Sequence, residues 1–193
     1  MILSLVPLIL LAADSDYTKV DDVDGIAIES RPVPSSSFVE LRLTTTTDKT
    51  PSSLCDAVFG DGKFDPEEPD LKARTVLEES ADERVTYDQI SPAVVSNRDY
   101  AVRAKRSRKD DGSCVMTFAA ANDNAPALPK GWVRITKISG SWTFTPQPDG
   151  KTRVVYVIHS DPAGSIPALF VEGTRRKMAV RWVKMILSRG KAP

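Results

Sequence analysis

Most of the chain alternates apolar and polar residues with the period of two that is typical of half-buried β-strands. The alternation is clear over residues 25–31 and 38–43, and shorter stretches with strand character follow at 76–79, 84–87, 100–103, 114–118, 132–135, 142–145 and 153–158. Short polar turns separate most of these stretches, and Asp111-Gly112 is a strong hairpin signal. Strands that are joined by short turns pair antiparallel, so the sequence predicts one antiparallel sheet.

Two segments have helical features. A short helix is predicted after Thr50, because a capping residue followed by Pro51 favours a helix start, and Gly60 ends it. The acidic stretch 61–70 contains two prolines and is predicted to be an irregular loop. Only residues 167–188 have the length and spacing of a long amphipathic helix, with Phe170, Thr174, Met178, Trp182 and Met185 on one stripe. Two strands, a helix, a meander of strands and a closing helix predict an α+β domain.

The first 13 residues, Met1 to Ala13, carry no charge and precede an abruptly acidic segment. The run is shorter than the about 20 residues that a membrane-spanning helix needs, but it fits the apolar part of a signal peptide that ends in small residues. We therefore expect export, with cleavage near Ala12 or Ala13, and a single domain over residues 14–193. No Lys or Arg precedes the run, and an apolar N-terminal helix packed on the domain is the alternative.

Composition narrows the class of partner. The chain has 193 residues, of which 41% are hydrophobic and 27% charged, which is the mixture of one soluble globular domain. Basic and acidic residues balance at 26 each, so no net field attracts nucleic acid. The balance hides a division, because residues 1–100 carry a net charge of −11 and residues 101–193 one of +11. Either the surface is bipolar, or the strands of the two halves intermingle and cancel the difference.

Few residues could support catalysis or bind a metal. His159 is the only histidine, and we interpret it as a wall or turn residue. Cys55 and Cys114 lack zinc-type spacing, and we expect two buried, inert thiols, although a disulfide would be stabilising in an oxidising compartment. Arg98 and Asp99 are expected to organise a turn at a strand start through charged hydrogen bonds. The sequence therefore predicts no catalytic residues, no metal and no cofactor.

Five sequence pieces, taken in order, resemble the START (StAR-related lipid transfer) domain. They are Ser96-Asn97-Arg98-Asp99-Tyr100, Asp111-Gly112-Ser113, Gly131-Trp132-Val133-Arg134, Gly140-Ser141-Trp142 with Pro146, and Asp161-Pro162-Ala163-Gly164-Ser165-Ile166-Pro167. The resemblance covers roughly Tyr17 to Ser188. The leader and the acidic stretch before Gly25 look like the exported bacterial members, which implies the periplasm.

The resemblance implies a helix-grip fold, in which a curved antiparallel sheet wraps a long C-terminal helix around an internal hydrophobic cavity. It also implies a lipid partner, such as a sterol or phospholipid, that is bound and carried without covalent chemistry. The alternative is an enzyme on the same general fold, like the polyketide cyclases and aromatases. The apolar residues expected to face inward, on the strands and on the long helix, would then be cavity wall rather than plain core: Tyr100, Val102, Ala104, Met116, Phe118, Trp142, Phe144, Tyr156, Ile158, Phe170, Met178 and Trp182.

The sequence departs from the family pattern in ways that bear on the ligand. Phe64 stands where the family usually has Trp, and Ala93-Val94 replace a frequent Trp-Pro. Many members place a second arginine, paired with an acid, in the cavity six residues after the first, but that position is Ala104 here. A weakly polar ligand head is therefore favoured over a charged one.

Two groups of basic residues could contact an anionic membrane transiently. The alternative is that the hairpin and the outer side of the helix are solvated. The two groups are Arg103, Lys105, Arg106, Arg108 and Lys109 on a hairpin, and Arg175, Arg176, Lys177, Arg181 and Lys184 on the long helix.

Overall fold

The computed structural model describes residues 16–34, 36–60, 62–92, 95–164 and 168–193, with only the backbone for 168–170. In these residues the chain forms strands β1 (Thr18–Val23), β2 (Ile26–Arg31), β3 (Glu40–Thr47), β4 (Leu71–Glu79), β5 (Glu83–Ile90), β6 (Arg98–Arg108), β7 (Cys114–Ala120), β8 (Val133–Arg134), β9 (Lys137–Pro146) and β10 (Thr152–Asp161). The helices are α1 (Pro51–Phe59) and α2 (Ala168–Arg189), and a short 3-10 turn covers Asn122–Asn124. The leader, residues 1–13, lies outside the described residues.

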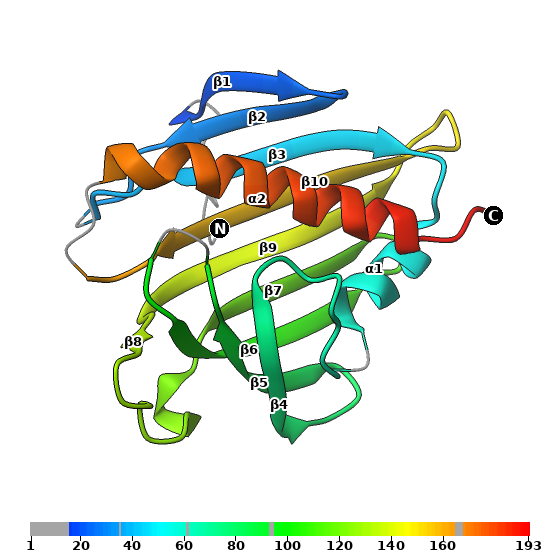
Figure 1. Ribbon diagram of the computed structural model, residues 1–193. Coiled ribbons are helices and arrows are strands. Elements are labelled where there is room, and N and C mark those ends of the chain that lie inside the picture. Colours follow the sequence, from blue (N-terminus) through cyan, green and yellow to red (C-terminus); the bar gives the residue numbers. More distant parts are fainter. Residues whose placement is uncertain (1–15, 35, 61, 93–94, 165–167) are drawn as a thin grey trace, which may run out of the picture.

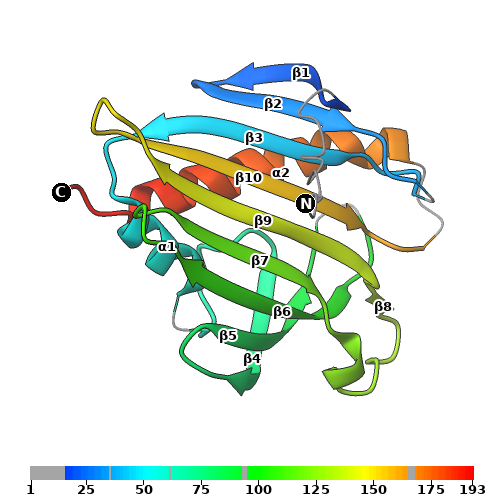
Figure 2. The same cartoon turned by 180° about the vertical axis from the view of Figure 1, so that it is seen from behind.

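The strands form one curved sheet in the order β1-β2-β3-β10-β9-β7-β6-β5-β4. All neighbours along this path pair antiparallel, and β8 adds a short parallel pair with β6. In Figure 1, α2 crosses the concave face of the sheet, and α1 packs beside the C-terminal end of α2. Figure 2 shows the back of the sheet, on which neither α1 nor α2 lies. The predicted α+β class, with a curved antiparallel sheet and a long C-terminal helix, is confirmed.

Local sequence explains where α1 begins and ends. Thr50 has extended backbone angles, and its side chain accepts a hydrogen bond from the Ser53 backbone N–H at 3.3 Å. Pro51 occupies the first helical position, where a missing N–H costs nothing. Gly60 follows the last residue with φ of 57°, a left-handed conformation that glycine adopts without strain. The helix predicted after Thr50 is confirmed with these bounds.

β1 was not predicted. Its residues are exposed or nearly so and include two acidic side chains, Asp21 and Asp22, so they lack the alternating apolar pattern of a half-buried strand. It forms because Asp24 and Gly25, both with positive φ, make a tight turn that folds the strand back on β2. The acidic side chains also protect this edge of the sheet from pairing with another chain.

Ion pairs between the acidic first half and the basic second half show that the two halves intermingle in the fold. Arg106 lies 2.9 Å from Asp56 and 3.0 Å from Asp82, so a basic residue of the second half bridges two acids of the first. Arg134 pairs with Asp99 at 2.5 Å. Further pairs that join the halves are Arg103–Glu78, Lys105–Glu83, Arg108–Asp56, Lys184–Asp24 and Arg189–Asp65.

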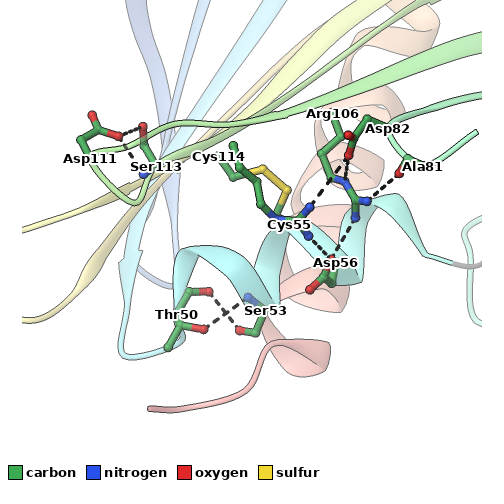
Figure 3. The surroundings of a disulfide bond; sticks show 11 residues. Thr50, Ser53, Cys55, Asp56, Ala81, Asp82, Arg106, Asp111, Ser113 and Cys114 are labelled. Carbon is green, nitrogen blue, oxygen red and sulfur yellow. Dashed lines mark hydrogen bonds and ion pairs between the residues drawn. A yellow bond between two sulfur atoms is a disulfide. The ribbon is translucent and has the colours of Figure 1, made fainter.

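Cys55 and Cys114 form a disulfide, so the expectation of two inert thiols is wrong. The bond joins the middle of α1 to the first residue of β7, with a Cα–Cα distance of 6.1 Å (Figure 3). Both residues are buried, and Asp56 beside Cys55 is held by Arg106 and Arg108. The sequence could not show this pairing, because it depends on how α1 docks on the sheet.

Candidate functional site

A cavity of about 320 Å³ lies between the concave face of the sheet and α2. Its size falls at the lower end of the range that is typical of small-molecule sites. The sheet contributes one wall through β3, β4, β5, β6, β7, β9 and β10. Helix α2 forms the other wall through Val171, Thr174, Arg175, Met178, Ala179, Trp182 and Ile186. Most of the lining side chains are apolar, so the cavity suits an apolar molecule.

The structure brings ten of the twelve residues proposed from the sequence to this cavity. They are Tyr100, Val102, Ala104, Met116, Phe118, Trp142, Tyr156, Ile158, Met178 and Trp182. The alternation of β6 explains three of them, since Tyr100, Val102 and Ala104 are two residues apart and share one face. Their contact with a ligand stays a prediction.

Phe144 does not line the cavity, which corrects that prediction. It shares the inward face of β9 with Trp142, and the two rings stack with centroids 6.0 Å apart. Phe144 pairs with Cys114 on β7, where α1 packs against the sheet and leaves no space. It is therefore fully buried core. The side chain of Phe170 lies outside the described residues.

Three stacked or tilted aromatic rings form the centre of the sheet wall. Trp142 and Tyr156 stack with centroids 4.0 Å apart, and Phe118 tilts toward Tyr156 at 6.5 Å. Gly140 makes room for this group, because a Cβ on that residue would lie 2.5 Å from the Phe118 ring and 2.1 Å from the Val157 carbonyl oxygen. The Gly140-Ser141-Trp142 motif thus combines a close approach of two strands with a wall residue.

A charged cluster at one side of the cavity was missed by the sequence analysis. The Arg74 guanidinium on β4 donates Nε and Nη2 to the two carboxylate oxygens of Asp88 on β5, both at 2.7 Å. Its Nη1 donates to Glu68 Oε1 at 2.7 Å, from the loop before β4. All three residues line the cavity. Ala104 replaces the arginine with which many family members form an ion pair inside the cavity. Here Arg74 on β4 forms such a pair with Asp88 on β5 instead.

Burial and mutual charge shift the pKa values of this cluster. Burial disfavours the charged form of Arg74, but the hydrogen bonds and charges of Asp88 and Glu68 outweigh it and raise the pKa of the guanidinium. Burial raises the pKa of Glu68 despite the opposing charge of Arg74. The Oε2 atom of Glu68 is buried and has no hydrogen-bond partner among the described residues.

Two tyrosine side chains complete the polar part of the wall. Neither the Tyr100 nor the Tyr156 hydroxyl makes a hydrogen bond in the part of the chain that the structure describes. Burial raises the pKa of both, and the Asp88 charge adds to the effect on Tyr100. Both phenols are therefore neutral at physiological pH, and each can donate and accept a hydrogen bond.

Arg98 and Asp99 connect the loops at the start of β6. The buried Arg98 guanidinium donates to the backbone carbonyls of Ser96, Pro162 and Ala163. Asp99 accepts from the Tyr87 hydroxyl at 2.8 Å, and its carboxylate also pairs with Arg134 on β8. These contacts agree with the organising role that the sequence suggested for Arg98 and Asp99.

His159 lies near the end of β10 under the loop that precedes β3. Its Nε2 is 3.1 Å from the Ser36 hydroxyl, and the ring also makes a hydrogen bond with the Phe38 backbone. Burial, together with the charge of Arg175, lowers the pKa of the imidazole. His159 is not among the residues that line the main cavity and instead holds the loop in place.

These observations define an α+β helix-grip domain with a mostly apolar internal cavity and one charged, hydrogen-bonding side. The START domain model matches residues 42–191, which is most of the chain. The chain therefore belongs to the START domain family, as the sequence motifs suggested.

Relatives and solved structures agree with this family. The chain is 27% identical over 161 residues to an uncharacterised protein of Pseudomonas aeruginosa, covering 81% of this chain and 78% of that protein. A STAR-related lipid transfer protein fragment from Xanthomonas axonopodis is 27% identical, with a TM-score of 0.79 over 90% of this chain and 97% of that one. Human StAR-related lipid transfer protein 5 shares the fold at 16% identity, with a TM-score of 0.80 and coverage of 93% and 88%.

An aromatase/cyclase from a Streptomyces species also has this fold. It is 13% identical, with a TM-score of 0.54 over 77% of this chain and 91% of that one. At this identity the likeness concerns the fold alone. No helix in the described residues is both long enough and apolar enough to cross a membrane.

Proposed function

We propose that this protein binds a lipid or another apolar molecule in the cavity under α2 and carries it without covalent chemistry. The observation that carries the proposal is the mostly apolar cavity wall formed by residues of seven strands and of α2. A close-packed core would leave no such space, and burying apolar ligand surface in it is favourable.

The test is to purify the protein under mild conditions and to measure it by native mass spectrometry beside an extract of its bound lipids. A bound mass that disappears on extraction and matches an apolar compound is expected. Uptake of the neutral dye N-phenyl-1-naphthylamine gives a second measurement, because its fluorescence rises in apolar surroundings. Absence of both a bound compound and dye uptake would contradict the proposal.

A second candidate function is an enzyme of the aromatase/cyclase type. The observation that favours it is the cluster of Glu68, Arg74 and Asp88, because ionisable groups with shifted pKa values in a cavity are candidates for acid–base chemistry. The carrier is preferred because the Arg74 guanidinium already holds both carboxylates in close ion pairs. Recovery of a bound ligand with altered mass after incubation would favour the enzyme, and recovery of unchanged ligand favours the carrier.

We also propose that the protein is exported to the periplasm with removal of residues 1–13. The uncharged leader supports this, and so does the disulfide between Cys55 and Cys114, because such bonds persist in oxidising compartments. The intact mass of protein from the periplasmic fraction should correspond to a chain that begins near Asp14. A soluble cytoplasmic protein that retains the leader would contradict the proposal.

For transient membrane contact, α2 is the better candidate of the two basic groups. The hairpin residues Arg103, Lys105, Arg106 and Arg108 are all in ion pairs with acids, which reduces the positive charge that they present. Lys177 and Arg181 on α2 are exposed. Replacing both by Gln should lower co-sedimentation with vesicles of anionic lipid, whereas Arg108→Gln should not.

A further inference from the structure

The charged side of the cavity contains an acceptor that the protein leaves unused. Glu68 is only 9% exposed, lines the cavity, and uses one carboxylate oxygen for Arg74. Its other oxygen, Oε2, is the only buried side-chain nitrogen or oxygen without a hydrogen-bond partner in the described part of the chain. Buried polar atoms are almost always paired, so an unpaired one on a cavity wall indicates a partner that the protein does not itself supply.

The arginines of the cavity wall already donate hydrogen bonds to protein acceptors. Arg74 directs Nε, Nη1 and Nη2 at Asp88 and Glu68. The other three arginines on the wall also donate to protein acceptors: Arg84 to Glu79 and the Phe59 carbonyl, Arg98 to three carbonyls, and Arg175 to Glu172 and the Val39 carbonyl. A carboxylate or phosphate head would therefore have to share each guanidinium with acceptors that the protein already supplies.

The local charge also opposes an anionic head. Glu68 and Asp88 share the single guanidinium of Arg74, so the three ionised groups together carry one negative charge. Tyr100, which lies across from Asp88 in the pairing of β5 with β6, adds a hydroxyl and no charge. In a cavity of low dielectric, an anion beside this cluster would meet repulsion with little screening.

We infer that the ligand head lies beside this cluster and donates a hydrogen bond to Glu68, so the ligand is an apolar molecule with a hydroxyl or ammonium head. This inference rests on the proposed function, since it assigns the polar end of the molecule that the cavity holds. Glu68 determines which head is accepted, and Tyr100 offers the head oxygen a second hydrogen bond.

The test keeps the tail constant and changes the head. Dodecan-1-ol, dodecylammonium, dodecanoate and methyl dodecyl ether each compete with N-phenyl-1-naphthylamine for the wild-type protein. The alcohol and the ammonium should displace the dye at concentrations about tenfold or more below those of the carboxylate and the ether, because only the first two donate a hydrogen bond to a charged acceptor. Equal displacement by dodecanoate and dodecan-1-ol would overturn the inference without any variant.

The matched variants are Glu68→Gln and Glu67→Gln. The amide of Glu68→Gln can donate as well as accept, so the difference between alcohol and ether should shrink to about threefold or less. Glu67 is the neighbouring residue, its side chain is 76% exposed and pairs with Arg189, and Glu67→Gln should keep the wild-type order. An unchanged preference in Glu68→Gln would overturn the inference.

The dye separates this inference from the proposed function. N-phenyl-1-naphthylamine reports occupation of the apolar cavity. Glu67, which is not among the lining residues, can be replaced without loss of dye binding, and the dye affinity of Glu68→Gln is measured first so that each competition is referred to its own protein. If the wild type and both variants bound neither the dye nor any of the dodecyl compounds, the proposed function would fail together with the inference. If all bound the dye and all heads competed equally, only the assignment of Glu68 would fail.

Discussion

The two ends of the cavity are held together by different interactions. At the helix end, α1 is joined to β7 by a disulfide, and Leu54, Cys55 and Phe144 are completely buried. At the loop end, where β6 begins and β10 finishes, residues 95–97 and 162–164 are joined through hydrogen bonds from Arg98 to backbone carbonyls. A covalent bond and apolar packing therefore hold the helix end, whereas polar contacts hold the loop end.

This difference indicates which end opens first. Local opening costs least where few apolar contacts are lost, and hydrogen bonds to backbone carbonyls can be replaced by water. A crosslink and close-packed apolar side chains have no such substitute. We expect the helix end to set the global stability and the loop end to open locally.

Removing the disulfide should have the largest effect. The bond closes a loop of 59 residues, and its loss should lower the free energy of unfolding by about 4 kcal/mol, because the unfolded chain gains conformational freedom. Cys55→Ala/Cys114→Ala and the wild type are compared by denaturant unfolding. Adding reductant should destabilise the wild type alone. A double variant as stable as the wild type would contradict the role of the helix end.

Replacing Arg98 should have a smaller effect at the opposite end. Arg98→Ala removes the hydrogen bonds of a buried guanidinium to three carbonyls, and it should lower the free energy of unfolding by about 2 kcal/mol. Hydrogen exchange of the amides near residues 95–97 and 162–164 should increase more than that near α1. Arg153→Ala, an exposed change on β10, is the control and should alter neither measurement. A variant that melts normally yet loses all ligand binding would show that Arg98 serves the ligand instead.

Filling the cavity between the two ends should affect binding much more than stability. Val102 lines the cavity on the same face as Tyr100 and Ala104. An indole at this position can enter the cavity, so Val102→Trp should cost less than the about 1–3 kcal/mol of an overpacked core. It should abolish uptake of a fluorescent sterol or phospholipid analogue.

Val155→Trp is the matched control for this experiment. Val155 neighbours the cavity residue Tyr156 on β10 and therefore points to the other face of the sheet. Val155→Trp should therefore leave uptake of the fluorescent lipid analogue unchanged. A strongly destabilised Val102→Trp would indicate solid packing at this position, and normal uptake would exclude this face as ligand wall.

The smallest expected effect concerns pH at the loop end. The folded pKa of His159 is lowered, so the unfolded chain binds more protons between that pKa and the unfolded value of about 6.5. Stability should therefore fall as the pH drops from 7 through this range. His159→Gln should flatten this part of the profile of melting temperature against pH, whereas an identical profile in both proteins would exclude His159 as the cause.

Much of the fold could be predicted from the sequence because alternation, turns and caps are local signals. Thr50-Pro51 marked the start of α1, and the alternation along β6 placed Tyr100, Val102 and Ala104 on one face. Those inward residues became cavity wall only through the family motifs, since periodicity does not distinguish a wall from a packed core. β1 escaped detection because its exposed residues have no apolar period.

The charged cluster could not be predicted because it depends on an irregular register. Glu79 pairs with Arg84 across the turn between β4 and β5, and a regular hairpin would continue to a pairing of Arg74 with Gln89. A bulge between Val76 and Glu78 shifts the register by one residue and brings Asp88 opposite Arg74. Glu68 then reaches Arg74 from a loop of the kind that is usually solvated. The disulfide likewise depends on the docking of α1, which sequence patterns do not specify.

The position of β10 has a consequence for the order in which the protein is made. β3 finishes at Thr47, and its partner strand β10 begins with Thr152, about a hundred residues later in synthesis. Until β10 is synthesised, no strand connects β3 to β9 in the sheet. Acidic residues of the first half also lack the arginines of the second half with which they pair in the folded protein. Such non-local pairing slows folding. A growing chain therefore has neither a complete sheet nor a cavity until β10 and α2 are available.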